Sequence, residues 1–433
     1  MAVCVAGALS AASMAQADAP IPQQQSVWTA DASAPYLPYA DAWPARWRRD
    51  GLEGTGVVIP RTATSARMTM VRLFGSAKPS PADVADLGEL AGPEQRDGFR
   101  FERAGAVLFA ESKVQRRSAG LNEGPSLAAG PDTGEVFVFA SARAEAPPRA
   151  LDRTFFAYYP PAPARKSDPT PELRAVALLM PGLLGMPETT MDPLTRTLRN
   201  HGIGVLRMLC QPARFTERIE FTIDRDQMEA SAAAVAACFN DRTAECAYAA
   251  EAAWRQVESR HPEAAALPRL VIGMSGGAMT LPTVVAREPQ KYRAAILIGG
   301  GCDFWLINER SNYRTNVDSV RCAWKGATPT QAELAEFDRL YLARAYLDSY
   351  HTAPALNGIR TLMVHGELDR AVPAELGELL WERVGKPERW SYAASHEMLC
   401  GLLPTEFARL NAWIEQALFG AAQNSGQPAL PPR

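Results

Sequence analysis

Ser275 lies in the segment Gly273-Met-Ser-Gly-Gly277, between an apolar run, 269–272, that predicts a short buried strand and a stretch of small residues that predicts a helix. A serine between a strand and a helix must lie on a sharp, strained turn, and flanking glycines let the two elements approach each other. The turn exposes the hydroxyl beside the first amides of the helix, which favour negative charge. The segment predicts a nucleophile; the alternative is a glycine-rich loop with an incidental serine.

A serine hydroxyl becomes a good nucleophile only when a base takes its proton, and histidine most often serves as that base. The chain has five histidines, and three of them follow Ser275. His396 lies in a loop after a predicted strand, 388–392, which suits a base. His365 ends a buried strand and is interpreted as a hydrogen-bonded structural residue, whereas His351 is expected at the surface or at a helix end.

The base works best when a carboxylate holds it, and two carboxylates, Glu367 and Asp369, follow the predicted strand 361–365. With Asp369 the order along the chain is Ser, Asp, His, which resembles the α/β-hydrolase family. Residues 365–373, His-Gly-x-x-Asp-x-x-Val-Pro, are similar to a frequent form of the family's acid loop and favour Asp369 over Glu367. The resemblance, which covers residues 153–420, implies Ser275 as nucleophile, Asp369 as orienting acid and His396 as base.

The same resemblance implies an oxyanion hole made of two backbone amides. One belongs to Gly276, the residue after the nucleophile. The other would come from the loop after the first buried strand, 181–185, and by position it is that of Leu183. This loop has proline where the family frequently has histidine, and it lacks the HGGG run, so Leu183 is alternatively a plain apolar turn residue.

The elements that must position these residues alternate along residues 151–420, where apolar strands are followed by helical stretches. This pattern predicts an α/β protein with a mostly parallel, doubly wound sheet of the α/β-hydrolase type and the site at the carboxyl ends of its strands. Buried strands are expected in 174–182, 203–209, 269–272, 293–301 and 361–365. Helices are expected in 190–200, 226–239, 247–260 and 405–418.

Residues 301–359 interrupt the alternation and are predicted to form a helical cap insertion over the site. The insertion is rich in aromatic residues, which could line a substrate pocket or merely seal the cap to the body. Apolar residues at helical spacing in 333–350 indicate a packing face, so in this part of the insertion the aromatic residues are expected to seal the cap to the body. The aromatic residues are Phe304, Trp305, Tyr313, Trp324, Tyr341 and Tyr346.

Residues 18–150 predict a β-rich N-terminal extension, with short strands at 57–59, 99–101, 106–109 and 135–139. These strands could join the main sheet as antiparallel additions or form a small domain. At the other end, residues 421–433 are expected to be a disordered tail.

Residues 1–17 form an apolar run that ends in Ala15-Gln-Ala17, as in a secretory signal peptide, although a basic start is missing. The prediction is a secreted or periplasmic protein; a buried apolar N-terminal helix is the alternative. Of seven cysteines, Cys4 lies in this run, and the other six permit disulfides. Cys238 and Cys246 bracket a short polar segment interpreted as a turn between two helices, so this pair is predicted to be joined.

Composition limits the other functions. A net charge of −3 without a basic run argues against nucleic acid, and beyond the N-terminus no apolar stretch is long enough to cross a membrane. No Cys/His spacing suits zinc, so neither a metal nor a cofactor is expected. The expected function is a secreted serine hydrolase that cleaves small-molecule carboxylic esters. A serine peptidase or amidase of the same fold, or a catalytically silent binding module, stays open because fold does not fix function.

Overall fold

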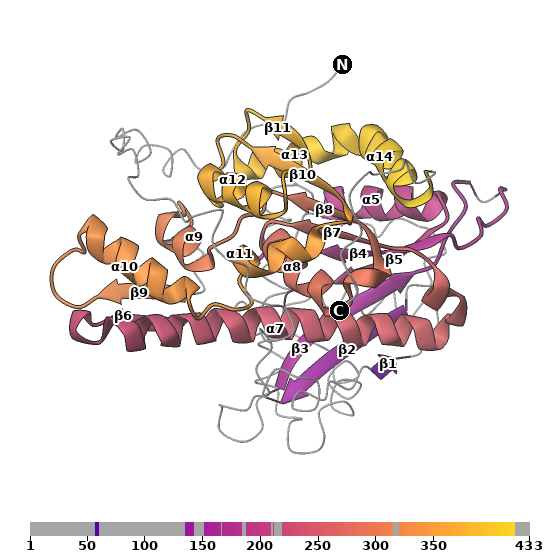
Figure 1. Cartoon of the computed structure of the whole chain (residues 1–433). Helices are drawn as coiled ribbons and strands as arrows, with labels where there is room; N and C mark the ends of the chain where they lie inside the picture. Colours follow the sequence, from indigo (N-terminus) through magenta and orange to yellow (C-terminus); the bar gives the residue numbers. More distant parts are fainter. Residues whose placement is uncertain are drawn as a thin grey trace, which may run out of the picture.

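The computed structural model of the chain, shown in Figure 1, describes residues 57–59, 135–142, 151–165, 167–183, 188–208, 211, 219–314 and 320–420. The predicted signal peptide (residues 1–17), the predicted tail (421–433) and the strands predicted at 99–101 and 106–109 lie outside these residues.

Within the described residues, a nine-stranded sheet runs in the order β1-β2-β3-β5-β4-β7-β8-β10-β11. The pairs from β5 to β11 in this order are parallel, whereas β1, β2 and β3 pair antiparallel with one another and with β5. The strands are β1 (Val57–Ile59), β2 (Glu135–Ala142), β3 (Leu151–Tyr159), β4 (Ala175–Met180), β5 (Ile203–Met208), β7 (Arg269–Met274), β8 (Tyr292–Ile298), β10 (Arg360–Gly366) and β11 (Glu388–Tyr392). This is the mostly parallel α/β sheet that the sequence predicts, and β1 and β2 are added to its edge rather than forming a separate sheet.

Helices cover both faces of the sheet (Figure 1). They are α5 (Glu188–Asn200), α7 (Met228–Arg260), α8 (Gly276–Arg287), α9 (Phe304–Arg310), α10 (Gln331–Leu342), α11 (Ser349–Thr352), α12 (Ala374–Arg383), α13 (His396–Leu402) and α14 (Phe407–Phe419). Alternate residues of a strand point to opposite faces. In β4, Val176 and Leu178 accordingly join one core, whereas Ala177 and Leu179 join the other.

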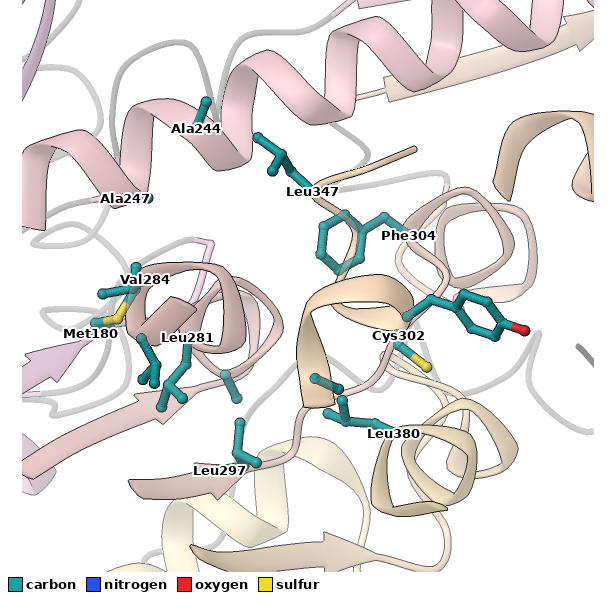
Figure 2. Close-up of a cluster of buried hydrophobic side chains, with 14 of the residues drawn as sticks. Met180, Ala244, Ala247, Leu281, Val284, Leu297, Cys302, Phe304, Leu347 and Leu380 are labelled. Atoms are coloured by element: carbon teal, nitrogen blue, oxygen red, sulfur yellow. The ribbon is translucent and has the colours of Figure 1, made fainter. Parts of the chain in front are cut away.

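The two cores have different helices. The core on one face contains α5, α13 and α14, with Leu194, Leu410 and Trp413 among its buried side chains. The core on the other face contains α7, α8, α9, α10 and α12. Figure 2 shows part of it, where Ala247 of α7 faces Val284 of α8 and Leu281 lies farther along α8. Small residues on α7 let the two helices approach closely.

The strand order reverses at β4, because the chain next forms β5 on one side of it and β7 on the other. At such a switch point the connections leave the carboxyl ends of the strands toward opposite sides, which opens a crevice where ligands bind. The loop after β4 and the Ser275 turn after β7 meet here. The sheet therefore places the predicted nucleophile and the predicted oxyanion loop at one edge.

The turn predicted between two helices near residues 239–245 does not exist. The whole of 228–260 is the single helix α7, the long helix that crosses Figure 1 from side to side. The polar residues of the supposed turn are held within the helix and by its neighbours: Thr243 Oγ1 donates to the Phe239 carbonyl at 2.8 Å, and the Asn240 side chain donates to the Arg344 carbonyl at 2.8 Å.

The continuous helix also makes the predicted Cys238–Cys246 disulfide wrong. The two residues are eight positions apart in α7. A helix rises about 1.5 Å per residue, so their backbones are about 12 Å apart along the axis, beyond the reach of a disulfide.

The insertion 301–359 is less helical than predicted. It contains β9 (Val320–Trp324), which pairs in parallel with β6 (Ile219–Ile223), a strand that the sequence analysis did not predict. The helix expected over 333–350 ends at Leu342, and α11 begins at Ser349. The Asn240 side chain holds the intervening turn, because its oxygen also accepts a hydrogen bond from the Leu347 amide at 2.9 Å.

Candidate active site

Ser275 occupies a strained turn between β7 and α8. Its φ of 52° lies in the left-handed region that residues other than glycine rarely adopt. Hydrogen bonds hold it there: its amide donates to the Ile298 carbonyl at 2.8 Å, and its carbonyl accepts from the Met279 amide at 2.9 Å. The turn presents the side chain at the carboxyl edge of the sheet.

The two flanking glycines are required by space, as the sequence predicts. A Cβ on Gly273 would lie 2.5 Å from the Gly277 carbonyl oxygen. A Cβ on Gly277 would lie 2.4 Å from the Met180 carbonyl oxygen and 2.6 Å from that of Pro181. The start of α8 thus packs directly against both β7 and the loop after β4.

His396 is buried at the start of α13 and bridges the other two predicted residues. Its Nε2 lies 2.8 Å from Ser275 Oγ, and its Nδ1 lies 2.6 Å from Asp369 Oδ2. Gly299 (φ 58°) lies against the ring, because a Cβ there would be 3.2 Å from His396 Cε1. The close approach of this backbone fixes the position of the imidazole.

Asp369 is buried in the loop after β10, and backbone amides fix its carboxylate. Oδ1 accepts hydrogen bonds from the amides of Ala371 and Val372, each at 2.9 Å, which leaves Oδ2 for His396. The side chain of Glu367, the other carboxylate of this loop, is exposed. The geometry thus favours the same carboxylate as the sequence pattern.

These contacts define the proton positions. Because an ionised carboxylate can only accept, His396 Nδ1 must donate to Asp369, and Nε2 is then free to accept the proton of the serine hydroxyl. A serine in this arrangement can be deprotonated as it attacks an electrophilic carbon.

The two predicted oxyanion donors lie on the two segments that meet at the Ser275 turn: the start of α8 and the loop after β4. Gly276 is the first residue of α8, where backbone amides have no acceptor within the helix. Leu183 is half-buried in the turn after Pro181, whose carbonyl packs against Gly277.

Gln211 fixes this loop and was missed from the sequence. Its buried side chain donates to the Pro181 carbonyl at 2.7 Å and accepts from Cys246 Sγ at 3.3 Å. No motif marks this glutamine, and its role depends on the spatial meeting of the loop after β4 with α7.

The other two histidines after Ser275 lie away from this arrangement. His365 ends β10 and is buried, and burial lowers its pKa. His351 lies in the last turn of the short helix α11, in agreement with the predicted helix end, but it is buried and not at the surface, which was the other alternative. Its Nε2 lies 2.7 Å from the Leu342 carbonyl oxygen, and burial lowers its pKa to about 4. It is a structural contact between α10 and α11.

The aromatic residues of the insertion mostly seal it to the body. Phe304, Trp305 and Tyr341 are buried in the core shared with α7, and Trp324 and Tyr346 pack against that core. Tyr313 differs, because its ring meets the His396 ring edge-on, with centroids 6.3 Å apart. Its hydroxyl donates to the carboxylate of Glu397, the residue after His396.

The described residues contain no group of three or more His, Cys, Asp or Glu side chains that could hold a metal ion. None of the helices described is long and apolar enough to cross a membrane.

The described part of the chain has the α/β-hydrolase fold. A mostly parallel sheet carries a serine on a strained strand-to-helix turn at its carboxyl edge, and the acid and the histidine follow in that order from later loops.

No protein-family model matches the sequence, and a search of curated proteins finds no match. Solved structures with a similar fold include the Pyrococcus furiosus esterase Pf2001, at 14% identity and a TM-score of 0.38, covering 62% of this chain and 88% of that one. Est1E from Butyrivibrio proteoclasticus is 14% identical with a TM-score of 0.36, covering 61% and 95%. A puromycin-hydrolyzing peptidase from Mycobacterium tuberculosis is 16% identical with a TM-score of 0.40, covering 66% of this chain and 46% of that one.

Proposed function

We propose that the protein is a serine hydrolase that cleaves carboxylic esters through an acyl-enzyme. The observation that carries the proposal is the continuous chain of contacts from Ser275 Oγ through His396 to Asp369, at 2.8 Å and 2.6 Å. A chance group of polar residues would have no reason to combine these contacts with a strained serine, close glycines and an acid held by two amides.

In the proposed reaction Ser275 Oγ attacks the acyl carbon while its proton moves to His396 Nε2. Asp369 stabilises the imidazolium that forms, and the amides of Gly276 and Leu183 receive the negative charge on the carbonyl oxygen. His396 then protonates the departing alkoxide. Water, deprotonated by His396, attacks the acyl-enzyme and releases the acid.

Ser275→Ala tests the proposal directly. The variant should lose ester turnover by about 10⁴-fold or more and also lose labelling by a fluorophosphonate, which reacts with activated serines. The matched control is Ser391→Ala, which removes an exposed serine hydroxyl from β11 and should leave both readouts unchanged. Ester hydrolysis by the Ser275 variant at the parent rate would refute the proposal.

Probe labelling and a substrate screen distinguish the proposed esterase from the two alternative functions. A catalytically silent binding module would leave the parent protein unlabelled by the probe. A peptidase or amidase would be labelled, and a screen of ester and peptide substrates separates it from an esterase.

Export to the periplasm or the medium belongs to the proposal as well, and it is supported by the apolar run of residues 1–17 and its Ala15-Gln-Ala17 ending. Mass spectrometry of protein isolated from its native host should find a mature N-terminus at residue 18. A chain that keeps residues 1–17 there would refute cleavage.

A further inference from the structure

Tyr313 and Glu397 join the insertion to the helix that carries His396. The Tyr313 hydroxyl donates to one oxygen of the Glu397 carboxylate, and the Ser395 hydroxyl donates to the other at 3.0 Å. The tyrosine ring also meets the imidazole of His396 edge-on. The pair therefore touches the histidine both through a ring and through the adjacent residue.

Tyr313 is itself held in place by the backbone. The preceding residue, Asn312, donates its amide to the Arg370 carbonyl at 2.9 Å, next to Asp369. The Tyr313 amide donates to Ser311 Oγ at 3.1 Å. This segment of the insertion therefore spans the loop of the acid and the helix of the base.

Glu397 carries negative charge beside the imidazole. Partial burial acts to raise its pKa, but hydrogen bonds from Tyr313 and Ser395 and the attraction of His396 outweigh it, so the pKa is lowered. Two other titratable groups near the histidine stay neutral: burial and the Glu397 carboxylate raise the pKa of Tyr313, and burial raises the pKa of Cys400 to about 11. Asp369 contacts the imidazole directly and supplies the other negative charge.

The charged side chains of the insertion next to Tyr313 are paired with other residues, and Glu367 and Arg370, in the loop that carries Asp369, are exposed to solvent. Arg314 contacts Glu309 at 2.7 Å, and Arg310 contacts Glu375 at 3.2 Å. Besides Asp369, Glu397 is thus the carboxylate that the contacts of Tyr313 and its position next to His396 in the chain place beside the imidazole.

We infer that Tyr313 and Glu397 form a positioning pair for His396, in which the tyrosine orients the Glu397 carboxylate and this carboxylate helps to stabilise the imidazolium. The inference rests on the proposed function and deepens it, because the imidazolium forms only when His396 takes the serine proton. Neither residue reacts with substrate; both act through the histidine.

The test is the pH dependence of kcat/KM for a simple aryl ester, measured on the full chain. Removing a negative charge beside the imidazole makes its protonation harder, so Glu397→Gln should move the acidic limb of the profile to lower pH by about 0.5. The same variant should lower kcat by about fivefold with KM within about twofold, since a base that holds its proton less well is a weaker catalyst.

Tyr313→Phe keeps the ring and removes the hydroxyl, so it should change the profile in the same direction but by less. The double variant should match Glu397→Gln alone, because the two residues act as one unit. Glu382→Gln is the control: it removes a carboxylate from α12 that pairs with Lys386, and it should leave the profile unmoved.

An acidic limb unchanged in Glu397→Gln, or a rise in KM alone, would overturn the inference and leave the pair as part of the pocket wall. Failure of the proposed function is separable, because it would appear as activity remaining in Ser275→Ala.

Discussion

Gly277 is the point at which the three segments of the site meet. Its missing side chain lets the carbonyls of Met180 and Pro181 approach α8, and Gln211 holds the second of these carbonyls in turn. A methyl group here would contact backbone atoms, which cannot move aside as a flexible side chain would.

Gly277→Ala should therefore push the loop after β4 away from the start of α8. We expect a loss of about 1–3 kcal/mol in the free energy of unfolding and at least tenfold in kcat/KM. Gly401→Ala is the control, because a Cβ at Gly401, in α13, would meet nothing within 4 Å. That variant should keep full activity and unfold at an equal or higher urea concentration. Equal behaviour of the two variants would contradict the packing account.

If Ser275, His396 and Asp369 act as the proposed catalytic unit, His396→Ala should reduce ester turnover to within about tenfold of Ser275→Ala, since the losses from residues of one unit are not additive. His365→Ala should keep measurable turnover, because His365 ends β10 and no contact with Ser275 is found among the described residues. Comparison of the three variants by single-substrate kinetics checks the assignment. If His365→Ala alone abolished turnover, the base would have to be reassigned.

The residues of the predicted triad could be found from the sequence because a local pattern marks each of them. Ser275 has flanking glycines, and Asp369 and His396 follow short apolar strands. Tyr313, Glu397 and Gln211 carry no such mark. Each acts through contacts between segments far apart in the chain, which one sequence does not reveal.

At the scale of elements, the loop after β8 and helix α10 meet through two buried carboxyl groups. Asp303, at the start of α9, and Asp338, on α10, are buried neighbours, and Asp303 Oδ2 and Asp338 Oδ1 each have no hydrogen-bond donor. Burial raises the pKa of both groups, that of Asp338 to about 7, and repulsion from Asp338 adds to the rise at Asp303. Ionising both Asp303 and Asp338 would place two negative charges close together in a buried site, which costs free energy, so the pair keeps one proton.

This proton makes stability depend on pH. An unfolded aspartate has a pKa near 3.9, so between about pH 4 and pH 7 the folded state binds more protons than the unfolded state. The free energy of unfolding should therefore fall as pH rises through this window. Asp338→Asn supplies an amide donor to Asp303 and removes the need for the proton. It should stabilise the protein by about 1–3 kcal/mol at pH 8 and by less at pH 5, measured by urea unfolding.

Asp348→Asn is the contrasting variant. Asp348 accepts hydrogen bonds from the amides of Asp303 and Phe304, at 2.8 Å and 2.7 Å, and from the Tyr341 hydroxyl at 2.8 Å. An asparagine would lose at least one of these bonds, so the variant should be less stable at both pH values. Stabilisation by Asp348→Asn, or a pH-independent effect of Asp338→Asn, would contradict the shared proton.

Element prediction succeeded where apolar runs were long and failed where polar residues interrupted helices. The buried strands β4, β5, β7, β8 and β10 lie where the sequence predicts them. The polar run near Asn240 predicts a turn, but α7 continues through it as one helix. The helical spacing over 333–350 predicts a helix beyond Leu342, but α10 ends there. In both cases Asn240 bonds to the turn at 344–347, and this tertiary contact overrides the local pattern.

At the scale of the whole molecule, the insertion and α7 enclose one hydrophobic core with the sheet. Phe304, Leu347 and Leu380 come from segments far apart in the chain and lie in the same cluster (Figure 2). The insertion is thus part of the main core rather than a separate unit. Of the two roles considered for the insertion's aromatic residues, sealing accounts for most of them, and Tyr313 is the exception beside His396.

The charges of the insertion bear on substrate choice. Amide cleavage requires protonation of a poor leaving nitrogen, and peptidases commonly spend binding energy from charged or extended subsites on orienting the chain. Here Asp303 is buried, Arg314 pairs with Glu309, and Arg310 pairs with Glu375. These charges are engaged within the protein, so they do not form an ionic subsite for a peptide.

We therefore expect a preference for esters over amides. The measurement uses two substrates with the same acyl group, one an alkyl or aryl ester and the other a peptide amide. The ester should show the higher kcat/KM even after each value is divided by the uncatalysed rate, because the charged residues named above are buried or paired and so would not specifically assist the amide. Ser275→Ala, run in parallel on both substrates, shows that one site performs both reactions. If kcat/KM divided by the uncatalysed rate were equal or higher for the amide, the protein would be better described as a peptidase or amidase.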